Sequence, residues 1–411
     1  MHILFVTNFF APDSGAAAVR LTRLAHQLQQ RGHQVTVLTS LPHFPQGQVH
    51  PGYRWRWTVK ENRDGVWVIQ TWLYATRSPS RILQLLSQAS FMLTAILRGL
   101  FISRPDVIFI EAQPIPTGTT GVLLAFIKRR PYVLNISDLW PDQLLTYGTL
   151  TENSRIYDLL RRWVDFTYRR ARGIAALSPA WADRIKAYIG SRNTIHVIYN
   201  GVDLNVFRPG IDTAAFREKY GLGDKKLFIF IGTLAAQYDF KTLLSVASQL
   251  QDRQDVRFIF IGRDVRHSEA HDLLDHSTLP NIQSIDWLQR YEMPVAWNAA
   301  YLSFWAMRDN DLYSGVIPTK LLEAQATGTP VVVGVRGITA DIIRQSESGI
   351  AVPPGDALGL AAAMRRLLDD ADFYTHCRHA ARQYAEAHYD VEQVTTHYEE
   401  LLFAAAQRKD S

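Results

Sequence analysis

The chain has 411 residues, 47% hydrophobic and 20% charged, which is typical of a globular protein and long enough for two domains of roughly 200 residues each. Its single cysteine, Cys377, excludes an internal disulfide and a cysteine-based metal site. A formal net charge of +5 is too small an excess for a dedicated nucleic-acid-binding protein, so we expect no nucleic-acid partner; it suits an anionic small ligand or an anionic membrane surface.

Short apolar runs alternate with helical segments along the first half of the chain. The first strand, at 2–7, has no basic leader before it, so we expect a cytoplasmic protein without a signal peptide. Further strands are expected at 35–39, 66–71, 106–111, 131–136, 173–177 and 195–199, and helices at 17–31, 80–101, 117–128, 153–171 and 179–188. Since strands such as VIFIEA are apolar on both faces, this alternation predicts a parallel, doubly wound sheet.

The turn after the first strand, TNFFAPDSGAAAVRL, is a candidate ligand loop. Gly15 and Ala16 open the following helix with side chains small enough to let a ligand approach the backbone N–H groups. An ordinary strand–helix turn with one glycine is the alternative interpretation.

Two helical segments in this half suit a membrane surface. The run at 82–101 is as long as a membrane span, but Gln84, Gln88 and Arg98 interrupt it, so a span, an interfacial helix and a core helix all stay open. The segment 155–172 interleaves aromatic residues with six arginines, at positions 155, 161, 162, 169, 170 and 172. A basic aromatic helix favours an anionic lipid surface, although the arginines could also form a solvated face.

The segment NISDLWPDQLLTYG, at 135–148, places polar groups after a buried strand. In a doubly wound sheet this edge is where ligands bind. Asp138 could orient a sugar hydroxyl or act as a base, with Ser137 beside it; capping of the next helix is the alternative.

A second strand–helix series follows the Gly-, Asn- and Pro-rich segment NGVDLNVFRPG. Strands are expected at 226–231, 256–261, 281–285, 301–304 and 330–333, and helices at roughly 371–386 and 391–407. We therefore predict two Rossmann-like, doubly wound α/β domains facing a central cleft, at 1–205 and 206–388. Residues 389–411 are expected to form a helix that packs back on the first domain.

The segment IPTKLLEAQATGTPVVVG, at 317–334, is the second candidate ligand site. Thr319 and Lys320 lie in the first turn of a predicted helix, where a cation needs an anion nearby or must reach solvent. Glu323 follows within one turn and could accept hydrogen bonds from two ribose hydroxyls. A surface Lys–Glu pair is the alternative. The histidines and acids show no metal-ligand spacing, so no metal is expected.

In their order along the chain these segments resemble family 4 glycosyltransferases of the two-domain GT-B fold. RGHQVTVLTSLPHFPQG, SDLWPD, IYNGVDLNVFRP, FIGTLAAQYDFKTLL, FIGRDV and PTKLLEAQATGTPVVV carry the resemblance. Within the family the chain looks most similar to the surface-polysaccharide branch (capsule, O-antigen, colanic acid), in particular to L-fucosamine transferases. The resemblance implies a nucleotide-diphosphate sugar donor, commonly a UDP-sugar, a glycan or lipid-linked acceptor, retention of anomeric configuration, no metal or other cofactor, and attachment to the inner face of the cytoplasmic membrane.

The resemblance also assigns residues, with some departures. Glu323 matches the second glutamate of the E-x7-E motif, which holds the ribose, while Gly315 stands where the first acid is expected. Lys320 becomes the candidate diphosphate ligand, and Lys241 is the nearest counterpart of a further basic residue. Donor contacts are assigned to Gly232, Thr233, Arg263 and Thr319, and acceptor-side contacts to Gly15, Ala16 and Ser137, which replaces a histidine.

Two other functions share this fold and stay open at the level of sequence. A sugar-nucleotide 2-epimerase would need acid and base groups around one donor and no acceptor groove. A non-catalytic sugar-nucleotide or glycan-binding subunit would explain the missing acid at Gly315.

Overall fold

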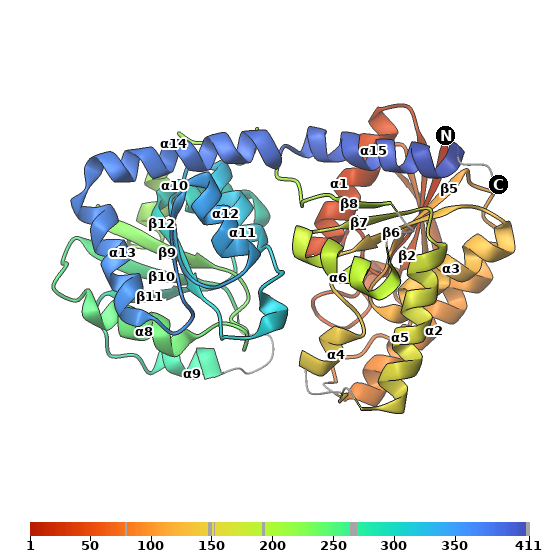
Figure 1. Cartoon of the computed structure of the whole chain (residues 1–411), viewed down its shortest axis with the longest axis horizontal. Coiled ribbons are helices and arrows are strands. Elements are labelled where there is room, and N and C mark those ends of the chain that lie inside the picture. The colour runs from red at the N-terminus through yellow and green to blue at the C-terminus, as the bar shows by residue number, and fades with distance from the viewer. Residues whose placement is uncertain (79, 147–149, 152, 191–193, 264–268, 408–411) are drawn as a thin grey trace. The chain divides into compact units, whose positions relative to one another are not determined.

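The computed structural model describes residues 1–78, 80–146, 150–151, 153–190, 194–263 and 269–407, and it divides into two compact units (Figure 1). The first unit comprises Met1–Tyr199 and Glu392–Ser411, and the second comprises Asn200–Val391. The junctions thus lie after residues 199 and 391, compared with the predicted 205 and 388.

Within the described residues, the first unit has an eight-stranded sheet in the order β3-β4-β2-β1-β5-β6-β7-β8. The strands are β1 (His2–Val6), β2 (Gln34–Ser40), β3 (Thr58–Arg63), β4 (Val66–Thr71), β5 (Val107–Glu111), β6 (Tyr132–Ile136), β7 (Gly173–Ala176) and β8 (Ile195–Val197). Neighbours pair in parallel, with Ile3 opposite both Val35 and Val107, except that β3 runs antiparallel to β4. Strand β3 was not predicted, because its sequence TVKENR is polar and lies at the sheet edge.

The helices of the first unit cover both faces of this sheet (Figure 1). They are α1 (Ala16–Gln30), α2 (Arg81–Leu100), α3 (Ile115–Lys128), α4 (Asp142–Thr146), α5 (Arg155–Arg170), α6 (Pro179–Ile189) and α15 (Val391–Gln407), with the short 3-10 helix η1 at Pro51–Tyr53. The C-terminal helix α15 contributes Tyr398, Leu401 and Leu402 to the core around β1 and β5. Arg31, the residue after α1, forms an ion pair with Glu399 of α15 at 2.8 Å, so α15 is both packed and ion-paired.

The second unit has, in the part of the chain that is described, a six-stranded parallel sheet in the order β11-β10-β9-β12-β13-β14. Its strands are β9 (Lys226–Ile231), β10 (Val256–Ile261), β11 (Ile282–Ile285), β12 (Ala300–Ala306), β13 (Val331–Gly334) and β14 (Gly349–Val352). Its helices are α7 (Ala214–Lys219), α8 (Phe240–Gln249), α9 (Glu269–Asp275), α10 (Met293–Ala299), α11 (Thr319–Ala326), α12 (Ile338–Ser346), α13 (Ala357–Asp369) and α14 (Ala371–His388), with 3-10 turns η2 (Arg290–Glu292) and η3 (Asp311–Tyr313). The predicted class of two α/β domains with parallel sheets is confirmed.

Candidate functional site

Lys320 occupies an aromatic enclosure at the carboxyl ends of β9 and β12, which are adjacent strands. Its Nζ lies 3.6 Å from the ring centroid of Phe230, 4.3 Å from that of Tyr238 and 5.4 Å from that of Trp305. Only 7% of the residue is exposed, and Nζ has no hydrogen-bond partner among the described residues. Burial lowers the pKa of this ammonium well below its usual range. Lys320 therefore meets neither the anion nor the solvent expected from the sequence.

Glycine backbone lies close to the Lys320 ammonium. Gly232 follows β9 with φ of +152°, and a Cβ built on it would lie 3.2 Å from the Lys320 Nζ. A Cβ on Gly262, after β10, would lie 1.9 Å from the Gly232 carbonyl oxygen. Both positions therefore require glycine, and the first lets backbone or ligand atoms come close to the lysine.

Glu323 lies one turn further along α11 and is buried, unlike a surface residue. Its Oε1 accepts a hydrogen bond from Arg290 Nη1 at 2.7 Å, and its Oε2 accepts one from Trp297 Nε1 at 3.1 Å. The carboxylate is thus held by two donors, and since each oxygen has a second lone pair it keeps capacity for further hydroxyl groups.

Apart from Gly315, the other predicted donor residues occupy more open positions. Thr319 is exposed at the first position of α11, Gly315 is buried in the preceding loop, and Thr233 is half-buried after β9. Lys241 is exposed on α8, outside the aromatic enclosure around Lys320. Arg263 is exposed and forms a two-pronged ion pair with Asp286, at 3.0 and 2.7 Å.

In the first unit, Ser137 belongs to a polar network that the sequence interpretation missed. Its Oγ donates to Glu111 Oε1 at 2.7 Å and accepts from Arg20 Nη2 at 2.7 Å. Asn135 donates to the other oxygen of Glu111 and accepts from Tyr398 of α15 at 2.8 Å. An acid ending an apolar strand, as in VIFIE, was the sequence signal for this network.

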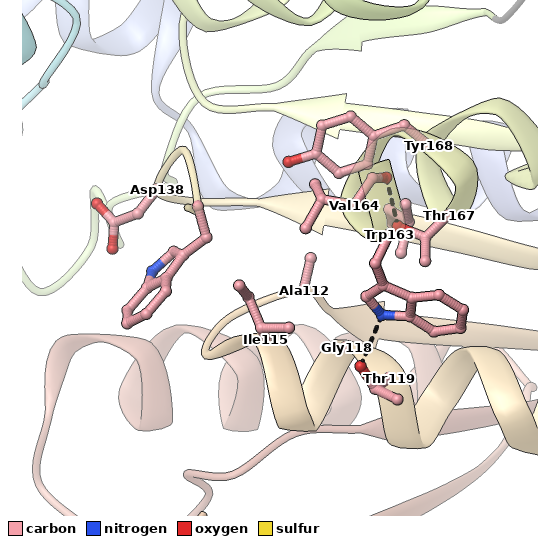
Figure 2. A pocket seen from close by; sticks show the side chains of 11 residues that line it. Ala112, Ile115, Gly118, Thr119, Asp138, Trp163, Val164, Thr167 and Tyr168 are labelled. Carbon is pink, nitrogen blue, oxygen red and sulfur yellow. Dashed lines mark hydrogen bonds between the residues drawn. The ribbon is translucent and has the colours of Figure 1, made fainter. Parts of the chain in front are cut away.

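Asp138 is half-buried beside this network and lines a pocket in the first unit (Figure 2). Burial raises the pKa of its carboxyl group, the charge of Glu111 raises it further, and Arg20 opposes both. The other pocket residues come from α3, α5, the end of β5 and β6 with the loop after it, and most are apolar or aromatic, including Ile115, Trp140 and Trp163. A carboxyl group beside aromatic rings is suited to binding a hydroxyl group whose neighbouring carbons are apolar.

The loop after β1 is organised by Asp13. Its Oδ1 accepts from the backbone N–H groups of His43 and Phe44, at 2.9 and 2.8 Å, and burial raises its pKa to about 6. Gly15 caps α1 with its backbone only, and a Cβ there would lie 3.1 Å from the Phe44 ring. Ala16 is exposed at the first position of α1.

Helices α2, α3 and α5 lie side by side in the first unit (Figure 1), with α2 packed on α3 and Phe126 of α3 against Phe166 of α5. By length and composition α2 is able to cross a membrane, but it packs on α3 through a face that includes Phe91, Ala95 and Gly99. Its opposite face exposes large apolar side chains, as do the ends of α3 and α5. They are Ile82, Leu85, Leu86, Leu93, Leu97, Leu100, Phe126, Ile127, Ile156, Leu159 and Phe166.

The arginines of α5 divide into two groups. Arg155, Arg162, Arg169 and Arg170 are exposed, as a membrane-contacting helix requires. The expectation that Arg161 belongs with them is wrong, because its side chain is 13% exposed, pairs with Asp165 at 2.6 Å and lies over the Tyr188 ring.

Comparison with known proteins covers nearly the whole chain. Residues 15–201 match the model of the glycosyl transferase 4-like domain, and residues 212–384 match that of glycosyl transferases group 1. A glycosyl transferase assigned to colanic acid biosynthesis in Escherichia coli (strain K12) is 24% identical over 407 residues, covering 96% of this chain and 98% of that protein.

Solved structures share the fold at low identity. Sucrose-phosphate synthase from Thermosynechococcus elongatus superposes with a TM-score of 0.76 at 18% identity, over 98% of this chain and 99% of that one. HepE from Anabaena, solved with UDP-glucose, superposes with a TM-score of 0.73 at 18% identity, over 98% of this chain and 100% of that one. The expected GT-B fold is confirmed.

Proposed function

We propose that this chain, a glycosyltransferase made of a 4-like domain and a group 1 domain, moves a sugar from a UDP-sugar to a glycan or lipid-linked acceptor in surface polysaccharide biosynthesis. The observation that carries the proposal is the buried, unpaired ammonium of Lys320 behind Gly232. The structure of HepE with UDP-glucose and the colanic acid assignment of the relative support the choice of donor and pathway. The matched domains favour transfer over the epimerase and non-catalytic alternatives.

The donor is assigned to the second unit. Lys320 and the N-terminal turn of α11 would bind the diphosphate, since a buried cation without a counter-ion gains strongly from an anion. Glu323 would bind the ribose hydroxyls with the lone pairs that Arg290 and Trp297 leave open. Thr319, Thr233 and Arg263 are proposed to contact the remaining donor groups.

The chemical step follows from this arrangement. Negative charge on the diphosphate grows as the bond to the sugar breaks, so an ammonium held in a low-dielectric enclosure stabilises the transition state more than the ground state. We propose that no metal takes part. We also propose that the acceptor hydroxyl attacks the same face of the sugar from which the diphosphate departs, so the anomeric configuration is retained. A leaving-group phosphate oxygen would then take the proton of the acceptor.

The acceptor is assigned to the first unit, at the pocket of Asp138. The carboxyl group of Asp138, at the rim of this pocket, would accept a hydrogen bond from an acceptor hydroxyl. Arg20, Glu111 and Ser137 hold the neighbouring strand end in place, so they act as positioning residues.

We further propose that the protein works at the cytoplasmic face of an anionic membrane. The exposed apolar face of α2 and the exposed arginines of α5 suit shallow insertion and charge attraction, respectively. Replacing Leu93 and Leu97 by Gln should lower sedimentation with anionic vesicles. Equal sedimentation of this variant and the parent would refute the assignment of α2.

One assay tests the reaction itself. Release of UDP from a UDP-sugar should require an added glycan or lipid-linked acceptor, and NMR of the product should show the anomeric configuration of the donor. Release without an acceptor would contradict transfer, and an inverted product would contradict retention. Full activity in EDTA is expected if no metal takes part.

A further inference from the structure

The loop between β2 and β3 displays two tryptophans to solvent. Trp55 is 98% exposed and Trp57 is 73% exposed, and both flanking arginines, Arg54 and Arg56, are exposed as well. Residues 41–60 contain no aspartate or glutamate, so this loop carries unopposed positive charge within its own sequence. Large exposed apolar side chains beside basic residues mark an interaction surface.

Hydrogen bonds hold this loop against β3. Tyr53 stands between Arg63, which donates to its hydroxyl at 2.8 Å, and Glu61, to which the hydroxyl donates at 3.4 Å. Trp55 has φ of +63°, a left-handed conformation that costs a bulky residue about 1–2 kcal/mol. Because its indole is almost fully exposed, the fold itself gains little packing in return for this conformation.

The loop adjoins α2 through a short chain of contacts. The rings of Trp57 and Trp72 lie 5.3 Å apart, and Trp72 N donates to the Trp57 carbonyl oxygen at 2.9 Å. The Trp72 carbonyl oxygen in turn accepts from Thr94 Oγ1 of α2 at 2.6 Å. Thr94 belongs to α2, the helix that exposes Leu93 and Leu97, so the loop is connected to the element that carries this apolar face.

We propose that residues 54–57 are an interfacial anchor that inserts Trp55 and Trp57 at the headgroup level of an anionic bilayer, with Arg54 and Arg56 on the lipid phosphates. Indole rings favour the membrane–water interface, where one edge is apolar and the other is hydrated. The loop follows the carboxyl end of β2, the edge of the sheet to which the acceptor is assigned. The anchor therefore keeps that edge near lipid-linked acceptors. The proposed anchor rests on the proposed function, transfer at a membrane surface. It adds a membrane contact made by residues outside α2 and α5.

The test is flotation of the full chain with vesicles of phosphatidylcholine and phosphatidylglycerol, and with phosphatidylcholine alone. Trp55→Ala should weaken partitioning into the anionic vesicles at least tenfold, because the variant loses the burial of about half of the indole surface, roughly 100 Å², in the interface. Arg54→Gln combined with Arg56→Gln should weaken it by a similar factor only in anionic vesicles at low salt. Trp287→Ala is the matched control, since Trp287 is a partly exposed tryptophan of the second unit.

UDP release with a water-soluble acceptor, measured without vesicles, separates this proposal from the proposed reaction. In this vesicle-free assay the loop variants should release UDP at the rate of the parent. If the parent itself released no UDP, the proposed reaction would be refuted, but the proposed anchor would not. Unchanged partitioning of both loop variants, or no partitioning of the parent, would overturn the anchor. A loop variant that partitions normally but loses transfer to the soluble acceptor would also overturn it and assign the loop to glycan binding.

Discussion

Replacing Lys320 by Met tests the central feature of the donor site. Met has a similar length, so it should fill the enclosure of Phe230, Tyr238 and Trp305 without leaving a cavity. An unpaired buried ammonium is costly, and three ring contacts of about 0.5–2 kcal/mol each offset only part of that cost. We expect the variant to be more stable than the parent by about 1–4 kcal/mol, the range seen when buried ion pairs are replaced by apolar residues of similar volume.

The stability difference should depend on pH in a defined direction. Burial lowers the pKa of Lys320 in the folded state, so between that value and 10.5 the unfolded chain binds more protons than the folded one. The parent therefore gains stability as pH rises through this window, and the advantage of Lys320→Met should shrink toward pH 10.5. Urea unfolding from pH 6 to pH 10 measures this. Lys241→Met is the matched control for the same change of side chain at an exposed site.

The turnover of Lys320→Met should fall although its stability rises. Loss of one charged donor to the leaving group costs about 2.7–4 kcal/mol, or roughly 100- to 1,000-fold in kcat. A stabilised but inactive Lys320→Met would agree with the proposed role. A destabilised variant with normal turnover would refute the reasoning, and loss of turnover in Lys241→Met with none in Lys320→Met would assign the diphosphate to the other lysine.

Three further outcomes are expected. Gly232→Ala should reduce UDP affinity, measured by calorimetry, and turnover at least tenfold. The added Cβ would lie 3.2 Å from the Lys320 Nζ, at a φ that is unfavourable for alanine. Parental UDP affinity in this variant would show that the ligand does not bind beside this residue. Glu323→Gln should weaken UDP binding by about 1.5–3 kcal/mol, and calorimetry with unchanged affinity would remove Glu323 from the ribose site. Tyr398→Phe should lower the unfolding free energy by about 0.5–1.5 kcal/mol through loss of its bond to Asn135, and an unchanged urea midpoint would contradict that assignment.

The sequence predicted the buried strands well, since a parallel strand covered on both faces must be apolar along its length. It missed β3 and β14, which lie at sheet edges and are polar or short. It placed Lys320 and Glu323 on the right helix turn, but their surroundings come from other elements of the fold. No local pattern in PTKLLE indicates that Phe230 and Trp305, far away in sequence, enclose the lysine. Arg161 was misjudged for the same reason, because its partner Tyr188 belongs to α6.

The return of α15 to the first unit has a consequence for biosynthesis. The ribosome synthesises the chain in order, yet the core of the first unit includes Tyr398, Leu401 and Leu402, which are made after the whole second unit. The core of the first unit therefore cannot be completed, and part of its apolar surface stays exposed, until the whole second unit has been synthesised. Nascent chains stalled before residue 391 should be bound by chaperones or degraded. A stop codon that removes α15 should lower the amount of folded protein strongly, although few residues are lost.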